Sequence, residues 1–407
     1  MKAIKVKKLY DGSKDNSMEN VTVVFDEKFI DIFEVVDDQK LNKYNIDNFE
    51  VIDYSNNYMM PGLIDAHVHL ILPGDGTPAE DHLAKHTLYE IQLVAAKNAT
   101  KALEHGITTL RDCGSIPKVI FGLRNCIDNG VITGPDLIVC GSPITSTGGH
   151  THYFKGEADG EEKIRHLVRK QFKNGANFIK LIATGGGSHG VVATGLNYTT
   201  PELNTVVEEG QRLGMFVTAH VTTIEGIRQI LKTNIDGMEH CWFFDKNYNL
   251  VYDPKLSEEI FKRKIYVCPT LQVLYGLIQY LKNKKRTENE NSELDEWLKF
   301  QESLIDNFGK QLKDGISFIA GSDAGWRINA FGNLVKGLEL MKEGGMSNRE
   351  LIYSATLRTA KHLGIDNVVG AVKTGLQADF IILEEDPIVD IGNIRKIIKV
   401  YKKGVRI

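Results

Sequence analysis

Six residues whose side chains could bind metal ions lie near the ends of separate apolar, strand-like runs. They are His67, His69, Lys180, His220, His240 and Asp323. Imidazole nitrogens and carboxylate oxygens are common ligands of zinc-type divalent cations. A set of this size could hold two such cations, and metal binding lowers the pKa of water enough to supply hydroxide near neutral pH. The pattern therefore favours a hydrolytic metal centre.

The local sequence around these residues indicates how they could meet. His67 and His69 form a His-x-His pair in PGLIDAHVHL. Alternate residues of a strand point to the same face, so both imidazoles could bind one ion. Each histidine could instead be an ordinary hydrogen-bonded residue. The occurrence of all six residues at strand ends in one repeating pattern favours a shared site.

Apolar runs alternate with amphipathic, helix-like stretches along most of the chain. We predict eight strands, at about residues 61–69, 106–111, 136–142, 177–183, 215–220, 235–240, 265–270 and 316–323. Eight strands with intervening helices are what a (β/α)8 TIM barrel of the α/β class requires. Side chains at the carboxyl ends of barrel strands converge on one mouth, which would bring the candidate ligands together.

Both ends of the chain differ from this alternating region. Residues 1–58 contain short alternating segments separated by turn residues, and residues 366–407 return to strand-like segments. We predict that the two ends together form a small β-sandwich domain, and that residues 59–365 form the barrel.

The composition is that of a globular protein without a strongly charged surface. Of 407 residues, 42% are hydrophobic and 25% are charged, and the net charge is −4. This balance gives no reason to expect binding to nucleic acid or to an acidic membrane. The five cysteines show no CxxC spacing. The N-terminus lacks a signal-peptide h-region, and no apolar run reaches the roughly 20 residues that span a bilayer. We therefore expect a cytoplasmic protein.

Several longer motifs extend the pattern over nearly the whole chain. They are PGLIDAHVHL, NFIKLIATGG, VTAHVTTIEGI, DGMEHC, IAGSDAG, SATLRTAKHLGI and GLQADFIILEEDP. In type and order these motifs resemble the amidohydrolase superfamily, and within it the imidazolonepropionase-like branch that includes metal-dependent dipeptidases and carboxypeptidases. The resemblance implies two divalent metal ions, which we expect to be Zn2+. It assigns His67, His69 and Asp323 to the more buried ion.

The resemblance also assigns His220 and His240 to the second ion, and Lys180, carboxylated on its amine, to a bridge between both ions. An unmodified lysine, with a pKa near ~10.4, is a cation and cannot bind a metal. Reaction with carbon dioxide makes the amine a carbamate anion with two oxygen donors. The alternative is a lysine of the barrel core that pairs with a nearby carboxylate. The superfamily's deaminases typically use one metal and a glutamate after the third histidine, whereas Val221 follows His220 here.

Charge balance indicates what such a centre would do. A hydroxide that bridges the metal ions would attack the substrate carbonyl, and the positive charge of the centre would stabilise the anionic tetrahedral intermediate. Asp323 would accept the proton of the water and return it to the leaving nitrogen, first as a general base and then as a general acid. We therefore expect hydrolysis of an amide bond.

Three further residues are predicted to bind the substrate. His150, in SPITSTGGHTHY, matches a histidine that family members use near the substrate carbonyl or carboxylate. Arg327 could bind a substrate carboxylate, or it could be a surface or helix-start arginine. Tyr198 lies in the glycine-rich loop after the fourth strand, where a lid could close over the substrate, or it could simply pack.

The preferred prediction is a binuclear zinc hydrolase, a dipeptidase or carboxypeptidase acting on small dipeptides or N-acyl amino acids, and we expect a homo-oligomer. Dipeptidase relatives often carry an aromatic residue or histidine where this chain has Val221, which weakens the transfer of any particular dipeptide specificity. The alternative enzyme is a cyclic-amide hydrolase that opens imidazolone or lactam rings. A third alternative is a barrel that serves only as a scaffold, but such proteins tend to lose ligands and all six are present here.

Overall fold

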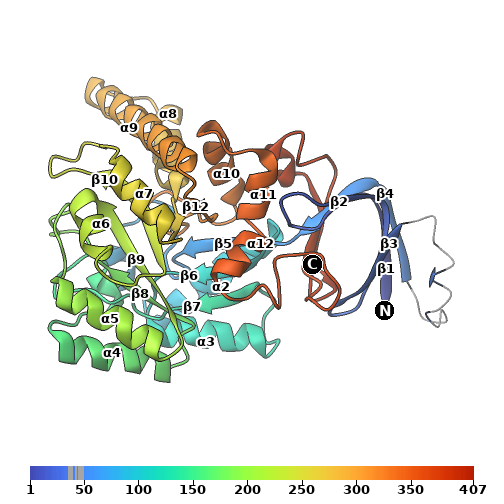
Figure 1. The fold of residues 1–407 in the computed structure, drawn as a ribbon, viewed down its shortest axis with the longest axis horizontal. Coiled ribbons are helices and arrows are strands. Elements are labelled where there is room, and N and C mark those ends of the chain that lie inside the picture. The colour runs from blue at the N-terminus through green and yellow to red at the C-terminus, as the bar shows by residue number, and fades with distance from the viewer. Residues whose placement is uncertain (35–39, 42–43, 45–49) are drawn as a thin grey trace.

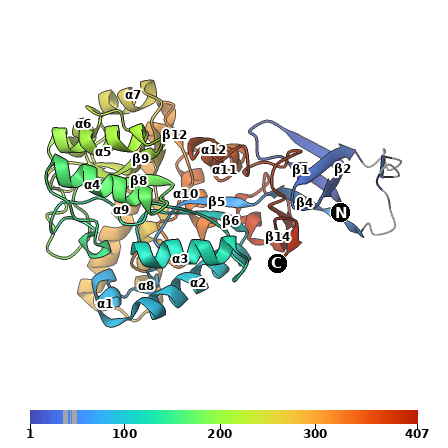
Figure 2. The same cartoon turned by 90° about the horizontal axis from the view of Figure 1, so that it is seen from below.

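Residues 1–34, 40–41, 44 and 50–407 are described by a computed structural model. A mixed α/β body makes up most of the molecule, and a β-sheet built from both ends of the chain lies to one side of it (Figure 1). Figure 2, turned by 90°, shows the same sheet at one end of the molecule. Within the described residues, no helix combines the length and the apolar character needed to cross a membrane.

The centre of the body is made of eight short parallel strands within the described residues. They are β5 (Leu63–Val68), β6 (Ile107–Asp112), β7 (Asp136–Val139), β8 (Phe178–Ile182), β9 (Phe216–Thr223), β10 (Gly237–Phe244), β11 (Tyr266–Cys268) and β12 (Ser317–Phe318). Each overlaps one of the eight predicted strands. Every residue of β5, β6 and β8 is buried, as expected for parallel strands that are covered on both faces.

These strands fall into two hydrogen-bonded groups, with the orders β5-β6-β7 and β12-β11-β10-β9-β8. At one junction between the groups, the amide of Ile144 donates to the carbonyl of Lys180 at 2.8 Å. At the other junction, the amide of Asp323 donates to the carbonyl of His67 at 2.7 Å. Candidate ligands therefore sit at both junctions, so the backbone bonds that join the groups also position the site.

Helices connect these strands and pack around them (Figure 1). They are α1 (Ala79–Lys85), α2 (Leu88–Glu104), α3 (Pro117–Asp128), α4 (Glu161–Lys173), α5 (Thr200–Arg212), α6 (Ile224–Ile230), α7 (Pro254–Lys262), α8 (Tyr275–Asn283), α9 (Glu288–Lys313), α10 (Leu334–Glu343), α11 (Asn348–Ser354) and α12 (Leu357–His362), with the 3-10 helices η3 (His152–Phe154), η4 (Leu271–Leu274) and η5 (Ile391–Arg395). Thr87 and Thr287 each form a capping box with a glutamate, which explains where α2 and α9 begin.

The two ends of the chain contribute strands to one sheet. Its strands are β1 (Lys2–Tyr10), β2 (Ser17–Phe25), β3 (Phe29–Glu34), β4 (Glu50–Pro61), β13 (Phe380–Leu383), β14 (Ile397–Lys402) and β15 (Val405–Arg406). Their order is β15-β14-β13-β4-β1-β2-β3, a single seven-stranded sheet among the described residues. The two-layered sandwich stays a prediction. The predicted boundary after residue 58 lies inside β4, because β4 continues to Pro61 and pairs there with Phe380.

A buried group of charges joins the terminal sheet to the body. The amine of Lys402, on β14, donates to Asp379 at 2.6 Å and to Asp136, at the start of β7, at 2.7 Å. The side chains of Lys402 and Asp379 are only 6% and 2% exposed. Burial acts to raise the pKa of Asp136, but the charge and hydrogen bond of Lys402, the charge of Lys403 and the hydrogen bond of Gln377 together outweigh it and hold this pKa below its usual value. The ammonium is therefore needed to balance two carboxylates.

We predict that Lys402→Met lowers the free energy of unfolding by about 3 kcal/mol, because it leaves the buried carboxylate of Asp379 without its cation. Urea unfolding at neutral pH measures this loss. Because the pKa of Asp136 is lowered in the folded state, its ionised carboxylate stabilises the folded protein at pH values above its unfolded pKa. This stabilisation is lost as the pH falls through about 4 and below. The difference in unfolding free energy between wild type and Lys402→Met should therefore become smaller in acid.

The matched control is Lys403→Met, because Lys403 is 44% exposed and lies 3.4 Å from the same Asp136. An exposed pair contributes about 1 kcal/mol or less. Equal losses in the two variants would contradict a structural role for the buried charge group.

Candidate metal centre

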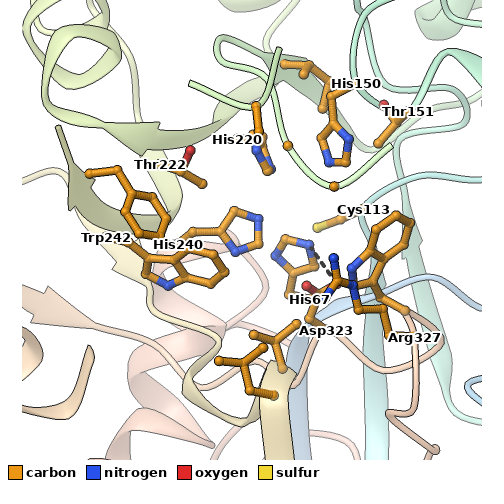
Figure 3. Close-up of a pocket in the computed structure, with 18 of the residues that line it drawn as sticks. His67, Cys113, His150, Thr151, His220, Thr222, His240, Trp242, Asp323 and Arg327 are labelled. Carbon is orange, nitrogen blue, oxygen red and sulfur yellow. Dashed lines mark ion pairs between the residues drawn. The ribbon is translucent and has the colours of Figure 1, made fainter. Parts of the chain in front are cut away.

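A cavity of about 360 Å³ lies at the carboxyl-terminal side of the parallel strands. Its lining includes all six candidate metal ligands, namely His67, His69, Lys180, His220, His240 and Asp323. Figure 3 shows His67, His220, His240 and Asp323 pointing towards one space from different elements. The structure therefore brings together residues that are far apart in the sequence.

His67 and His69 direct the same ring nitrogen towards Asp323. Nε2 of His67 lies 3.6 Å, and Nε2 of His69 3.4 Å, from Oδ1 of Asp323. Nδ1 of His67 lies 2.8 Å from Oε2 of Glu239. Nδ1 of His69 lies 3.0 Å from the carbonyl oxygen of Gly114. Hydrogen bonds on the far nitrogen fix the orientation of each ring and leave Nε2 as the atom available to a metal ion.

His220 and His240 are oriented in a similar way on neighbouring strands. Nδ1 of His240 lies 2.8 Å from the hydroxyl of Thr270, and Nε2 of His220 lies 3.0 Å from the carbonyl of Gly185. The ring centroids of His220 and His240 are 4.5 Å apart. His240 therefore offers Nε2 and His220 offers Nδ1, so the four histidines do not all present the same nitrogen.

Burial keeps these imidazoles neutral. It lowers the pKa of His69 to about 4 and the pKa values of His67, His220 and His240 well below the usual value. Neighbouring positive charge, including that of Lys180, adds to the effect at His67. A neutral ring is the form that binds a metal ion, because its free nitrogen carries a lone pair.

Lys180 is the least ordinary member of the set. Its side chain is 2% exposed, and its Nζ has no hydrogen-bond partner among the described residues. Among the described residues, Lys180 therefore does not form the hydrogen-bonded pair with a carboxylate that was the alternative prediction. A buried ammonium without a partner is costly, whereas a carbamate with metal ions beside it would be balanced.

Asp323 and His240 both have left-handed backbone conformations, with φ of 59° and 70°. Such conformations are uncommon outside glycine and cluster at functional sites. Burial raises the pKa of Asp323 to about 7, although the charge of Lys180 acts in the opposite direction. The carboxyl group can therefore gain or lose a proton near neutral pH.

Three of the six residues already have the spacing of a metal site. His67, His240 and Asp323 offer ligand atoms that all lie within 4.8 Å of one another. Nitrogen and oxygen donors of this kind, on neutral imidazoles and a carboxylate, suit a divalent cation of the zinc type. The residues present therefore fit a divalent metal ion.

A buried network beneath the ligands escaped the sequence analysis. Glu239 lies within the lining strands and accepts hydrogen bonds from Arg111 at 2.6 Å and from Thr218 at 2.7 Å. Arg111 also donates to the hydroxyl of Tyr266 at 3.0 Å. Although burial opposes it, the guanidinium of Arg111 holds the pKa of Glu239 well below its usual range. The available signal was the presence of charged residues within apolar runs, with Arg111 and Asp112 in TTLRDCG and Glu239 in GMEHC.

Two other buried carboxylates hold the backbone near the ligands. Asp65 accepts hydrogen bonds from the amide of Ser322 at 2.9 Å and from its hydroxyl at 2.5 Å. Asp112 accepts from the amide of Leu70 at 2.8 Å. Asp65 precedes His67 by two residues and Ser322 precedes Asp323, so this contact ties together two segments that carry ligands.

The predicted substrate-binding residues are only partly brought together. His150 and Arg327 line the cavity, and Nδ1 of His150 lies 2.6 Å from the hydroxyl of Ser188. Tyr198 does not line it. Its buried hydroxyl donates to the carbonyl of Ala158 at 2.8 Å, which is the packing role that the sequence left open.

Comparisons with known proteins identify the family of this chain. The model of the Amidohydrolase family matches residues 58–407, and the chain belongs to this family. It is thus a hydrolase of the amidohydrolase superfamily, whose members generally bind divalent metal ions.

Individual relatives differ in how much of the chain they match. An ochratoxinase from Aspergillus niger is 27% identical over 370 residues, which cover 82% of this chain and 71% of the relative. An imidazolonepropionase from Clostridium tetani is 36% identical over 64 residues, only 16% of this chain and 15% of the relative. The solved structure of an Xaa-Pro dipeptidase with bound methionine matches with a TM-score of 0.83 and 25% identity, covering 100% of this chain and 99% of that chain.

We predict that Glu239→Gln weakens metal binding by about 10-fold to 100-fold, because the amide no longer holds the ring of His67 as a carboxylate does. Competition with a chelator of known affinity measures the change. Thr218→Val is the matched control, since it removes one neutral hydrogen bond to the same carboxylate. An affinity in Glu239→Gln as high as that of the control would contradict the orienting role of Glu239.

Proposed function

We propose that the protein is a binuclear zinc hydrolase that cleaves the amide bond of small dipeptides or N-acyl amino acids. The observation that carries the proposal is the buried amine of Lys180, which has no hydrogen-bond partner in the described part of the chain and lies among neutral imidazoles. Carboxylation would convert this cation into an anion with two oxygen donors. Bound divalent ions would supply Lewis-acid activation of water and of the substrate carbonyl.

The proposed ligand sets follow the ring orientations. His67, His69 and Asp323 would hold the more buried ion, because both Nε2 atoms face the Asp323 carboxylate. His220 and His240 would hold the second ion, and a carboxylated Lys180 would bind both. A scaffold without activity would have no need to keep these ionisable groups out of water.

Asp323 is proposed to move the proton. Its carboxyl group would receive a proton from the attacking water and give it to the leaving nitrogen, first as a general base and then as a general acid. Its amide is held by the carbonyl of His67 at 2.7 Å, which fixes the carboxylate beside the ligands. The left-handed backbone of Asp323 is part of the same arrangement.

The residues on one side of the cavity support the proposal that the substrate carries a free carboxylate. Arg327 and His150 line this side, and Figure 3 shows them away from Trp242 with the candidate ligands between. Arg327 would bind the carboxylate of the leaving amino acid, which places the scissile carbonyl over the metal ligands. Similarity to an Xaa-Pro dipeptidase supports a dipeptide-sized substrate.

A cyclic-amide hydrolase is the second candidate function. The observation in its favour is the short match to an imidazolonepropionase, at 36% identity over 64 residues. A ring substrate without a free carboxylate would make no use of Arg327. Activity towards the two substrate classes therefore separates the candidates.

For the architecture, we propose that the eight parallel strands close into a (β/α)8 barrel at residues 59–365, and that residues 1–58 and 366–407 form the small β domain. Hydrogen bonds at both junctions between the strand groups, near Lys180 and Asp323, support the closed barrel. Isolated parallel bridges between Ile144 and Leu181 and between Val68 and Ala324 support it further.

We predict that Lys180→Ala loses most of its bound metal and at least about a thousandfold in turnover, since the bridging anion is gone. Elemental analysis of purified protein gives the metal content, expected to be close to two ions per chain in wild type. Added short carboxylic acids should restore part of the activity.

Cys113→Ser is the control, because Cys113 lines the same cavity but is not among the proposed ligands. It should keep its metal. Normal metal content in Lys180→Ala would exclude the bridge.

The proposed function is tested with a library of dipeptides, N-acyl amino acids and cyclic amides on metal-reconstituted enzyme. We predict turnover of the acyclic substrates with a free carboxylate. Capping that carboxylate as a neutral amide should raise KM by about tenfold or more, because the interaction with Arg327 is lost. Turnover confined to cyclic amides would instead establish the second candidate.

A further inference from the structure

The cavity has two chemically different sides. One carries the candidate carboxylate-binding residues His150 and Arg327, with Trp326 beside them. The other is a wall of aromatic rings, which we call the aromatic wall. It consists of Trp242, Phe244, Tyr248, Trp297 and Phe300. The candidate metal ligands lie between the two sides: Figure 3 shows His240 and His67 between Trp242 and Arg327.

The rings of the aromatic wall form a continuous path that starts at a candidate metal ligand. The centroid of Trp242 lies 5.0 Å from that of His240 and 5.8 Å from that of Phe244. Phe244 and Phe300 stack with centroids 5.5 Å apart and planes at 14°. Trp297 follows, 6.0 Å from Phe300. A substrate group that packs on this wall would therefore lie next to the candidate metal ligand His240.

The aromatic wall is held in place by α9, the long helix between β11 and β12. Asn307, on α9, donates to the carbonyl of Trp242 at 2.7 Å. The indole nitrogen of Trp242 donates to the carbonyl of Pro269 at 3.0 Å, which fixes the ring. Trp297 and Phe300 lie on the same helix. The wall is therefore ordered before a ligand arrives, which reduces the entropic cost of binding.

From this geometry, and resting on the proposed function, we infer that the substrates carry a large apolar, preferably aromatic, acyl group that packs on the aromatic wall. The leaving amino acid would be directed to the side of Arg327, so the acyl group of the same amide must point towards Trp242. Phe300 and Trp242 then determine specificity for the acyl side.

An apolar group fits the wall better than a cation does. Phe244 is 4% exposed, Phe300 is also purely apolar, and the indole nitrogens of Trp242 and Trp297 already donate to Pro269 and Glu293. Among the described lining residues, Glu296 is the acidic group on this side, and it belongs to the exposed face of α9. Aromatic cages can also bind cations, so a cationic probe is included in the test.

The test measures binding without turnover. The probes are N-(3-phenylpropyl)glycine, N-ethylglycine and N-(5-aminopentyl)glycine, in which a methylene group replaces the scissile carbonyl. Isothermal titration of wild type should show that the phenyl probe binds at least about tenfold more tightly than the ethyl probe. In Phe300→Ala this ratio should fall to about threefold or less, and Phe300→Leu should keep part of it.

Phe172→Ala is the matched control, because Phe172 is 46% exposed on α4 and does not line the cavity. It should leave the ratio at its wild-type value. Unfolding temperatures report whether each variant is folded, and Phe300→Leu keeps the inference testable if Phe300→Ala is not.

Equal affinities for the phenyl and ethyl probes in wild type would overturn the inference, as would tighter binding of the aminopentyl probe. The ratio of kcat/KM for N-(3-phenylpropanoyl)glycine over N-acetylglycine gives a second readout. Equal kcat/KM for the two substrates would contradict the inferred role of the aromatic wall but not the proposed hydrolysis. Absence of turnover with the phenyl preference intact in binding would contradict the proposed hydrolysis instead.

Discussion

The architecture of the site depends on keeping several ionisable groups out of water at the same time. Arg111 and Glu239 form a fully buried pair, and Glu239 in turn holds the ring of His67. Buried charges persist only where they are paired and hydrogen-bonded. Lys180 lacks a hydrogen-bond partner among the described residues, and we propose that carboxylation of this amine together with bound cations completes the charge balance of the site.

The buried charges are held together by side chains from several neighbouring strands. The network under the ligands uses Arg111 on β6, Thr218 on β9, Glu239 on β10 and Tyr266 on β11. It therefore crosses between the two hydrogen-bonded groups of strands through side chains. The same strands lead into the loops that line the cavity, so a buried, charged base lies below the residues that face a ligand. In the proposed function the base would support the chemistry, and Arg327 and the aromatic wall would select the substrate.

Local pattern was enough to predict the strands and to single out six residues that the fold brings to one cavity, because short-range features mark both. An apolar run that ends in a histidine, lysine or aspartate identifies a strand end wherever the strand lies. The partners of Glu239 could not be predicted, since they come from three other strands and one sequence contains no signal of their proximity. The environment of Tyr198 could not be predicted for a similar reason. Its place in a glycine-rich loop did not reveal that its hydroxyl donates a hydrogen bond to the carbonyl of Ala158.

The central claim is that the amine of Lys180 carries a carboxyl group that joins two metal ions. Anomalous diffraction from crystals of the metal-loaded protein tests it most directly, because it locates the ions and shows the lysine side chain in the same map. The account predicts two anomalous peaks beside His67 and His220, with additional density at Nζ of Lys180 in contact with both. A single peak next to an unmodified lysine would contradict it.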